Sequence, residues 1–340
     1  MSTFRRAQRG FALVIVLWVL AGLTVVAVAV ASSVRTSSEG IKLLRDRVRA
    51  EAAFLGTSAR VKVIAATAGT SRNAYHGPRG LLFADARALR AGEDEWVQLQ
   101  DIRGLVQLQR INEARATRLL RGCGAGEIET PKLLDALQDY TDKDTVKRIN
   151  GAEAFEYAAT DLPPPRNAPL LSRDELWRVK GWRELKPLWA SADCDALISV
   201  RGDGSFNRNT APMAALLADG MDATAASSLM AAREDGFVDT KLNTVTPGDS
   251  SNPFNFAGGG SVGSILRVRH SAGWVEWTAE YELELTPTRN GGPWRVHEIR
   301  STPRQPRVES PRRDLPPVNF WDPARDAELN NAASGLPFAN

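Results

Sequence analysis

The sequence predicts an α+β fold in which a long N-terminal helix packs on an antiparallel sheet and a large helical domain is inserted between the strands. Three observations lead to this prediction. An uncharged run and an amphipathic helical pattern adjoin each other in residues 11–68. Strand-like alternation occurs near residue 100 and again after residue 265. Between them lies a helical region broken by proline and glycine. Helices segregated from one antiparallel sheet define the α+β class.

The length, net charge and cysteine count exclude some classes of function. The chain has 340 residues and a formal net charge of +3. That length suits one large or two modest domains, and so weak a basic excess gives no nucleic-acid footprint. Two cysteines are too few for a disulfide scaffold or a structural zinc site. Cys123 and Cys194 therefore either form one disulfide in an oxidising compartment or remain free thiols.

The N-terminal segment predicts a membrane helix. Residues 11–34 contain no charged side chain. At about 1.5 Å per residue, this run reaches the roughly 30 Å of a bilayer core. Three arginines in residues 1–10 place this leader in the cytoplasm and the rest of the chain outside. A cleaved secretory signal, ending at Ala29 and Ala31, is the alternative, although its apolar stretch is usually only about 7–15 residues.

The helical pattern continues past the membrane, which favours a retained helix over a cleaved signal. One helix is predicted from Phe11 to about Ala68, half in lipid and half against a soluble domain, with Gly69 as its stop. The apolar residues that define its second half recur at steps of three and four on one face: Ile41, Leu44, Val48, Ala52, Leu55, Ala59 and Val63.

The next region, 35–111, holds this second half of the helix and the first strands. Residues 70–94 are rich in Gly, Arg and Asp, and we expect a loop or short helix there. Strands are predicted from Trp96 to Ile102 and from Leu105 to Leu108. Residues 112–240 form the inserted helical domain, in which repeated prolines and glycines limit the helices to short ones.

The final strands lie in residues 241–303. From Val275 to Leu285 apolar residues alternate with Glu and Thr, which predicts a half-buried antiparallel strand. A strand at Ile265–Arg269 precedes it, and a turn at Asn290-Gly291-Gly292 leads to a strand at Trp294–Ile299. Residues 304–340 are rich in Pro, Arg and Asn, and are predicted to be a disordered tail.

The junction of leader and apolar run resembles the prepilin-peptidase site of type IV pilins and type II secretion pseudopilins. A basic leader ends in Gly10, and the apolar run begins at Phe11. The resemblance implies cleavage between Gly10 and Phe11, followed by methylation of the Phe11 amine. Most members carry glutamate at the fifth mature position, which here is Ile15. Its absence is similar to the K-type minor pseudopilins of type II secretion.

The central region resembles the same K-type family. LDALQDYTDKDTVKRINGAEAFEY, Leu134–Tyr157, shows spaced aspartates followed by Gly-Ala-Glu and Tyr. PRNAPLLSRDELWRVKGW, Pro165–Trp182, and FNRNTAP, Phe206–Pro212, are similar to two further family segments. The resemblance implies a pilin-like helix and sheet with an inserted α-helical domain. Together with the leader and the last strands it covers most of residues 5–303.

The resemblance also implies a role, partners and a location. The role is the tip of a short periplasmic pseudopilus that supports protein export. The partners are the I- and J-type minor pseudopilins, the major pseudopilin, the prepilin peptidase and the inner-membrane secretion platform. The location is the bacterial inner membrane, with one span and most of the chain in the periplasm. A tip subunit has no subunit ahead whose amine a glutamate would pair with, so Ile15 avoids an unpaired charge in lipid.

An acidic cluster is the candidate metal site. Asp139, Asp142, Asp144 and Glu153 supply the oxygen ligands that calcium takes, and the resemblance implies calcium in this domain. The spacing is not that of an EF-hand, and Lys143 lies between two of the aspartates. Helix caps and surface ion pairs are the alternative interpretation.

The alternative function is a membrane-anchored periplasmic binding protein with a helix-hairpin-helix element for DNA. Asn209–Phe237 resembles such a hairpin, but Asp222 replaces its second glycine and acidic residues outnumber basic ones around it. Acidic side chains repel phosphate, so a structural helix pair is favoured. We do not expect an enzyme, because the three histidines share no motif spacing and no phosphate loop or nucleophile elbow occurs.

Overall fold

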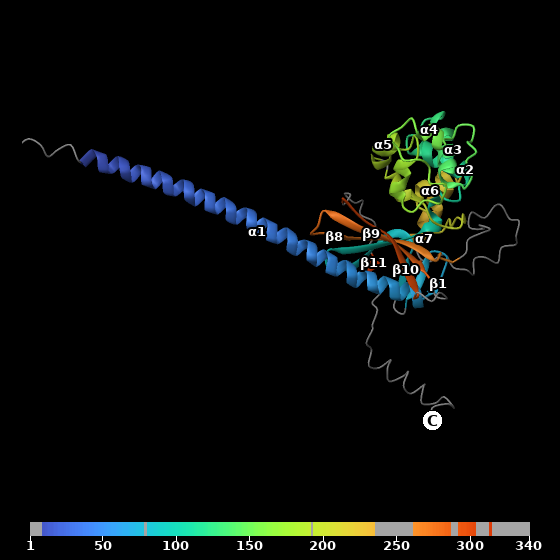
Figure 1. Cartoon of the computed structure of the whole chain (residues 1–340). Helices are drawn as coiled ribbons and strands as arrows, with labels where there is room; N and C mark the ends of the chain where they lie inside the picture. The colour runs from blue at the N-terminus through green and yellow to red at the C-terminus, as the bar shows by residue number, and fades with distance from the viewer. Residues whose placement is uncertain are drawn as a thin grey trace, which may run out of the picture. The chain divides into compact units, whose positions relative to one another are not determined.

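We describe the protein from a computed structural model. The structure describes residues 9–77, 80–191, 193–234, 261–286, 292–303 and 313–314. The chain divides into two compact units, residues 1–55 and 56–340, and each is described by itself. The predicted fold class is confirmed: a long N-terminal helix, an antiparallel sheet and a block of short helices make up the protein (Figure 1).

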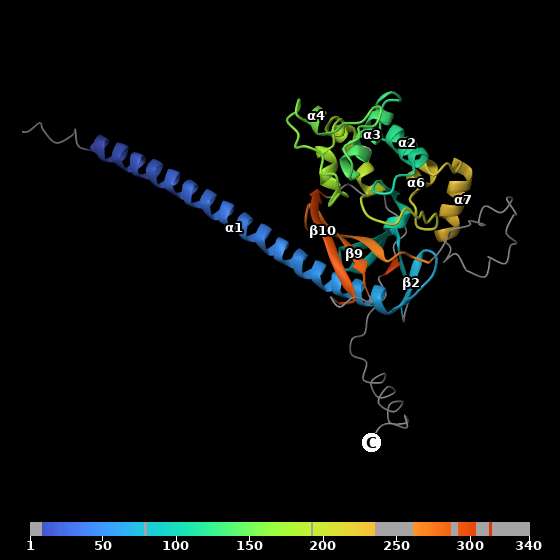
Figure 2. The ribbon, with the colours of Figure 1, turned by 45° about the vertical axis from the view of Figure 1, so that its right-hand side comes forward.

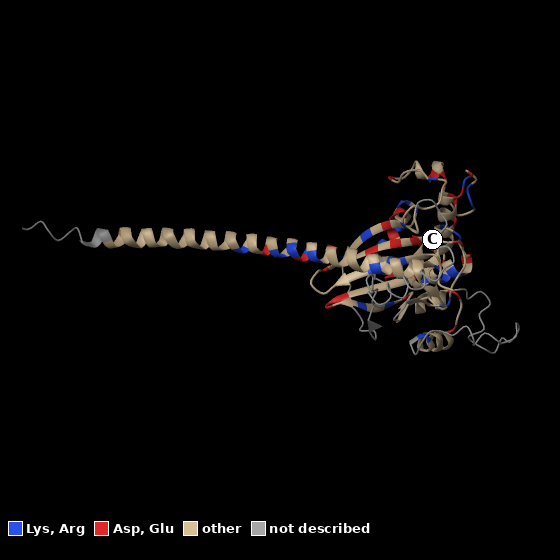
Figure 3. Ribbon diagram, turned by 90° about the horizontal axis from the view of Figure 1, so that it is seen from below, with Lys and Arg blue, Asp and Glu red and all other residues tan. Residues whose placement is uncertain are grey.

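The first helix, α1, runs from Arg9 to Thr67, as the continuous pattern predicted. Within the described residues one helical stretch, Leu13–Thr67 of α1, is long and apolar enough to cross a membrane. Figure 3 shows that its apolar half gives way to a half that bears both positive and negative side chains. The Gly10–Phe11 junction lies inside α1, and Ile15 lies in its apolar half.

The face of α1 that packs on the sheet differs from the predicted one. Leu55, on the predicted face, is 67% exposed, whereas the residues packed on the sheet belong to another arc of the same helix. Ser58 supplies one reason, because its hydroxyl donates a 2.9 Å hydrogen bond to the Tyr281 hydroxyl and so turns this arc towards the sheet. The buried residues of the last turns are Thr57, Ser58, Val61, Ile64 and Ala65.

The main sheet has six strands in the order β10-β9-β8-β5-β4-β11. Neighbours are antiparallel, except that β11 pairs with β4 in parallel. Its strands are β4 (Asp85–Gly92), β5 (Glu95–Asp101), β8 (Ile265–Ala272), β9 (Trp277–Leu285), β10 (Trp294–Pro303) and β11 (Arg313–Asp314). A small sheet joins β1 (Gly69–Thr70), β2 (Ala74–Gly77) and β3 (Gly80–Phe83), and β6 (Val106–Gln107) pairs with β7 (Ile198–Ser199).

Two predicted irregular regions contain strands. The expectation of a loop or short helix at 70–94 is wrong, because β2, β3 and β4 lie there. Their apolar residues Leu82, Phe83 and Leu89 are buried, but the interspersed Arg and Gly residues hide the alternation. In the predicted tail, residues 313–314 form β11 on the β4 edge. The rest of the tail and the Asn290-Gly291 part of the predicted turn lie outside the described residues.

The helical block, residues 112–234, lies against the sheet (Figure 2). Its core includes Leu137, Trp182, Trp189 and Leu216, all at most 1% exposed. The short helices are those that the prolines and glycines predicted. They are α2 (Glu113–Gly122), α3 (Glu129–Thr141), α4 (Ala154–Tyr157), α5 (Lys186–Ser191), α6 (Met213–Ala218) and α7 (Ala223–Glu234). Short 3₁₀ helices occur at η1 (Ile102–Gly104), η2 (Arg173–Arg178), η3 (Arg183–Leu185) and η4 (Cys194–Leu197).

Strand β9 is buried on both faces, although its alternation predicted only half burial. Tyr281 and Leu283 face α1, while Glu280 and Glu282 on the other face are only 3% and 0% exposed. The charged face is buried because the helical block covers it and supplies arginines, among them Arg173. Alternation therefore identified the two faces of the strand but not the partner of the second one.

Candidate functional sites

The loop between α3 and α4 brings three of the four predicted metal ligands together. One carboxylate oxygen each from Asp142, Asp144 and Glu153 lies within 4.8 Å of the others. Asp142 follows the last turn of α3, and Glu153 immediately precedes α4. The end of α3, the start of α4 and the twelve-residue loop between them therefore form this site. We call Asp142, Asp144 and Glu153 the acidic trio.

The acidic trio contains buried carboxylate oxygens that the protein leaves without partners. Within the described residues, Oδ1 of Asp142 and both carboxylate oxygens of Glu153 are buried, and apart from the capping contact of Glu153 with the Glu156 backbone N–H no hydrogen bond reaches them. Burial, reinforced by the neighbouring carboxylates, raises the pKa of Glu153. Burial and Asp144 likewise raise the pKa of Asp142, although Arg148 opposes this. Unpaired buried carboxylates are unfavourable at neutral pH, and a hard cation would remove that penalty.

Asp139 has a different task from the acidic trio. It is 0% exposed, and its Oδ2 accepts a hydrogen bond from the Arg148 backbone N–H at 3.2 Å. Gly151 is required beside it, since a Cβ there would lie 1.9 Å from Asp139 Oδ2. Asp139 thus fixes the loop through the Arg148 backbone. This contact gives a reason for the aspartate at 139 and the glycine at 151 in the segment Leu134–Tyr157. Burial raises its pKa, against the hydrogen bonds from Arg148 and Ala152.

Asn167, which lies outside this loop, contacts the backbone of Asp144. The Asn167 side chain donates from Nδ2 to the Asp144 carbonyl at 2.9 Å. Its Oδ1 is buried without a partner among the described residues. The trio and this neutral oxygen fit the oxygen-rich environment of calcium better than a thiol- or imidazole-based metal. The sequence did not indicate a role for Asn167, although this residue lies in the segment Pro165–Trp182 on which the family resemblance partly rests.

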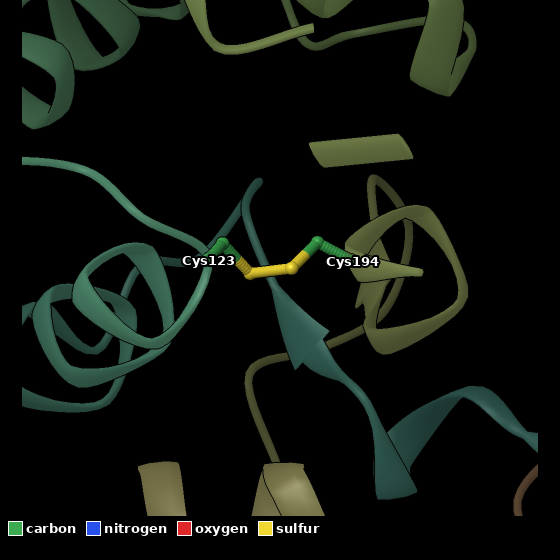
Figure 4. The surroundings of a disulfide bond; sticks show 2 residues. All are labelled: Cys123 and Cys194. Atoms are coloured by element: carbon green, nitrogen blue, oxygen red, sulfur yellow. A yellow bond between two sulfur atoms is a disulfide. The ribbon is translucent and has the colours of Figure 1, made fainter. Parts of the chain in front are cut away.

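Cys123 and Cys194 are joined as a disulfide (Figure 4). Cys123 follows α2 and Cys194 begins η4; their Cα atoms are 6.1 Å apart, and the two residues are 71 positions apart in sequence. Both residues are at most 4% exposed. The bond ties the first helix of the helical block to the segment that returns to β7.

The predicted hairpin is α6 and α7, which meet at Gly220 with φ +92°. Its basic neighbours are already engaged. Asp219 accepts from Arg115 and Arg208, each at 2.6 Å. Arg233 is 2% exposed and donates to the Ala211 carbonyl at 2.8 Å. An arrangement that directs these side chains inward favours the structural interpretation of the hairpin over DNA binding.

The FNRNTAP segment fastens the helical block to the sheet. Asp101, at the end of β5, is 0% exposed and accepts from Asn207 Nδ2 at 3.0 Å and from the Gly263 N–H at 3.1 Å. The Arg103 N–H donates to it at 2.9 Å, and Thr210 Oγ1 lies 3.4 Å away. The sequence pattern indicated the segment but not Asp101, because Asn207 and Asp101 are 106 positions apart in sequence.

A layer of paired charges was also missed. We call it the ionic layer: Arg173, Arg267, Glu280, Glu282 and Glu298. Arg267 contacts Glu282 at 3.1 Å, and Arg173 pairs with Glu280 and with Glu298, the latter at 3.4 Å. Each of these side chains is at most 5% exposed. Burial alone would raise the pKa of Glu280, but the three arginines around it, Arg267, Arg173 and Arg269, lower it to about 2.

The fold and these sites define a class: an α+β protein with a helix able to span a membrane and a helical block fastened to its sheet. Residues 97–186 match the family model described as type II secretion system (T2SS), protein K. This segment runs from β5 to the start of α5 and contains the acidic trio. The chain therefore carries a type II secretion protein K domain, and the resemblance to the K-type minor pseudopilins is confirmed there.

Two further comparisons complete the picture. A solved structure described as the GspK-GspI-GspJ complex from the enterotoxigenic Escherichia coli type 2 secretion system is similar to this chain at 16% identity. The match covers 79% of this chain and 99% of that chain, with a TM-score of 0.47. The search of curated proteins found no match.

Proposed function

We propose that the protein is a minor pseudopilin at the tip of the type II secretion pseudopilus, where it assembles with the I- and J-type minor pseudopilins. In this role it initiates the pseudopilus and supports protein export across the outer membrane. The protein K domain at residues 97–186 carries the proposal. The major pseudopilin, the prepilin peptidase and the inner-membrane platform are the further partners that this role requires.

The exposed side of α1 supports an assembly function. We call Ile41, Leu44, Val48 and Leu55 the apolar stripe. These four side chains are 60–67% exposed, although they share one face of the helix. A run of large apolar side chains left in water marks an interaction surface. A partner helix with its own apolar face would cover the stripe by side-by-side packing.

Co-purification tests the role. The full-length chain in detergent should bind the I- and J-type proteins of its own secretion system. Leu55→Glu should weaken this binding at least about tenfold, because it places a charge within an apolar contact. Leu43→Glu is the matched control: Leu43 is 71% exposed but lies about 120° around α1 from Leu55, outside the stripe. Absence of binding by the unchanged chain would refute the tip assignment.

Processing follows from the same proposal. We expect the mature protein to begin at Phe11, with the helix intact, a methylated amine and its bulk in the periplasm. Retaining residues 11–34 keeps the membrane anchor, whereas cleavage after Ala31 would remove it. Intact-mass measurement of the protein purified from the native membrane distinguishes these two N-termini.

The acidic trio supports calcium as a ligand. A cation bound only by the native state raises the melting temperature. Millimolar calcium should therefore stabilise the full-length chain, and Asp142→Ala or Glu153→Gln should abolish the effect. Asp161→Ala is the control, since Asp161 belongs to the same block but pairs with Arg183 at 2.7 Å. An unchanged melting temperature in the parent chain would eliminate the site.

The disulfide fits a domain outside the cytoplasm. We expect Cys123 and Cys194 to resist thiol labelling in the unfolded, unreduced protein isolated from the periplasm, and to react after reduction. Replacing both with alanine should lower the free energy of unfolding by about 2–5 kcal/mol, as loss of a native disulfide does. Two reactive thiols without reductant would show that the bond does not form.

A further inference from the structure

The apolar stripe is bordered by net charge on one side only. Successive residues of a helix are rotated by about 100°, so the stripe occupies an arc of about 60°. The next arc of about 60° holds Lys42, Arg45 and Arg49, which we call the basic ridge. All three side chains are exposed, and no Asp or Glu of residues 35–55 falls in that arc.

The opposite border of the stripe is neutral. It holds Arg47 and Glu51, whose side chains pair at 3.0 Å, one helical turn apart. The remaining acidic residues of this segment, Glu39 and Asp46, lie on the back of the helix, away from the stripe. Whatever covers the stripe therefore meets positive charge on one side and a balanced pair on the other.

Phospholipid headgroups do not fit this ridge. The uncharged run ends at Val34, and at about 1.5 Å per residue Lys42 lies about 12 Å and Arg49 about 22 Å further along the axis. The headgroup region extends only about 5–8 Å beyond the hydrocarbon core on each side. A spanning α1 therefore carries its basic ridge past the lipid surface, where another protein is the available partner.

A second copy of this chain is also a poor fit. Two parallel copies joined at their stripes would set the basic ridge of one against the Arg47–Glu51 pair of the other, which offers no net opposite charge. Charges that flank an apolar seam decide which helices pair and in which orientation. In such a helix pair, the acidic side chains that complement Lys42 and Arg45 must come from a different chain.

We propose that the basic ridge selects the partner of the stripe: a helix of another chain that carries acidic side chains beside its own apolar seam, level with Lys42–Arg49. The inference rests on the proposed assembly function and adds the chemistry of the partner to it. Opposite charges beside the seam speed association and reject helices with basic borders.

Charge reversal at one ridge position tests the proposal. The full-length chain in neutral detergent is titrated with the I- and J-type proteins at low and high sodium chloride. Binding by the parent chain should weaken as salt rises, since screening acts on exposed charges. Arg45→Glu should weaken binding about tenfold at low salt and remove most of the salt dependence. Arg47→Glu makes the same charge change across the stripe and should have the smaller effect.

The possible outcomes distinguish failure of the basic-ridge proposal from failure of the proposed assembly function. No binding by the parent chain refutes the assembly function. Parent-like affinity of Arg45→Glu, or equal losses for Arg45→Glu and Arg47→Glu, overturns the ridge while leaving the assembly function standing. An Arg45→Glu defect that appears only in bilayers containing anionic lipid would assign the ridge to headgroups and also overturn the proposal. Loss in Arg45→Glu that is partly restored by charge-reversing acidic positions of the partner helix supports it.

Discussion

On one face of the six-stranded sheet, Tyr281 and Leu283 of β9 lie under the last turns of α1; on the other, Glu280 and Glu282 of the same strand lie under the helical block. The first contact is mainly apolar, with a hydrogen bond from Ser58 to Tyr281 and one from Arg60 to the Ala91 carbonyl, and apolar burial favours contact without fixing direction. The second consists of paired charges, each of which needs a partner at the right distance. The hypothesis that follows is that buried apolar area stabilises the contact of α1 with the sheet. Paired charges fix the orientation of the helical block on the other face.

The largest expected effect breaks the ionic face. Arg173→Met should lower the free energy of unfolding by about 3 kcal/mol, because it removes the buried cation that Glu280 and Glu298 share, although Glu280 keeps Arg269. Arg183→Met is the control: it removes an ion pair whose side chains are 50% and 80% exposed, and should change stability by at most about 1 kcal/mol. Denaturant unfolding of the full-length chain measures both. Equal losses would show that the ionic layer has no special role.

Low pH should reduce the contribution of the ionic layer to the free energy of unfolding. Burial raises the pKa of Glu280, but Arg267, Arg173 and Arg269 outweigh it and lower the pKa to about 2. As pH falls, the Glu280 carboxylate is therefore protonated at a lower pH in the folded protein than in the unfolded chain, where its pKa is near 4.5. This contribution is complete above the unfolded value and is lost as pH falls towards the folded one.

The melting temperature should accordingly fall as pH decreases through this window, and Glu280→Gln should flatten the fall. Glu298 titrates in the opposite sense, since burial raises its pKa. A single glutamate therefore does not set the whole profile, and the comparison between the parent and Glu280→Gln isolates the one in question. Identical slopes for the two proteins would contradict the role given to Glu280.

The smallest effect lies on the apolar face. Tyr281→Phe removes the 2.9 Å hydrogen bond from Ser58 and keeps the ring, so it should lower stability by about 1 kcal/mol. Ser58→Ala alone and combined with Tyr281→Phe completes a double-mutant cycle in the same unfolding assay. A loss as large as that of Arg173→Met would mean that this single bond, rather than apolar area, holds the helix.

These two faces also show how far the sequence could lead. The apolar period of three and four in residues 41–63 predicted α1, because helical periodicity is a local property. The strands near Leu82 and Leu89 were missed, since arginine and glycine interrupt the alternation. The burial of Glu280 was missed because its partner Arg173 is 107 positions away in sequence.

The candidate site divides in the same way. Asp142, Asp144 and Glu153 lie close together in sequence, and the structure brings them together. Asp139, predicted as a fourth ligand, instead holds the loop through the Arg148 backbone. Sequence spacing gives neighbours on a loop, but only the fold shows which carboxylate points into the cluster and which one closes the loop.

Site-specific photo-cross-linking in cells tests the central claim, that the apolar stripe of α1 is an assembly surface. The photoreactive residue replaces either Leu44 or Leu43, which are adjacent leucines, 65% and 71% exposed, on different sides of the helix. The account predicts a covalent adduct with an I- or J-type minor pseudopilin from position 44 and little or none from position 43. Adducts of equal yield from both positions, or none from position 44 in an assembled secretion system, would contradict it.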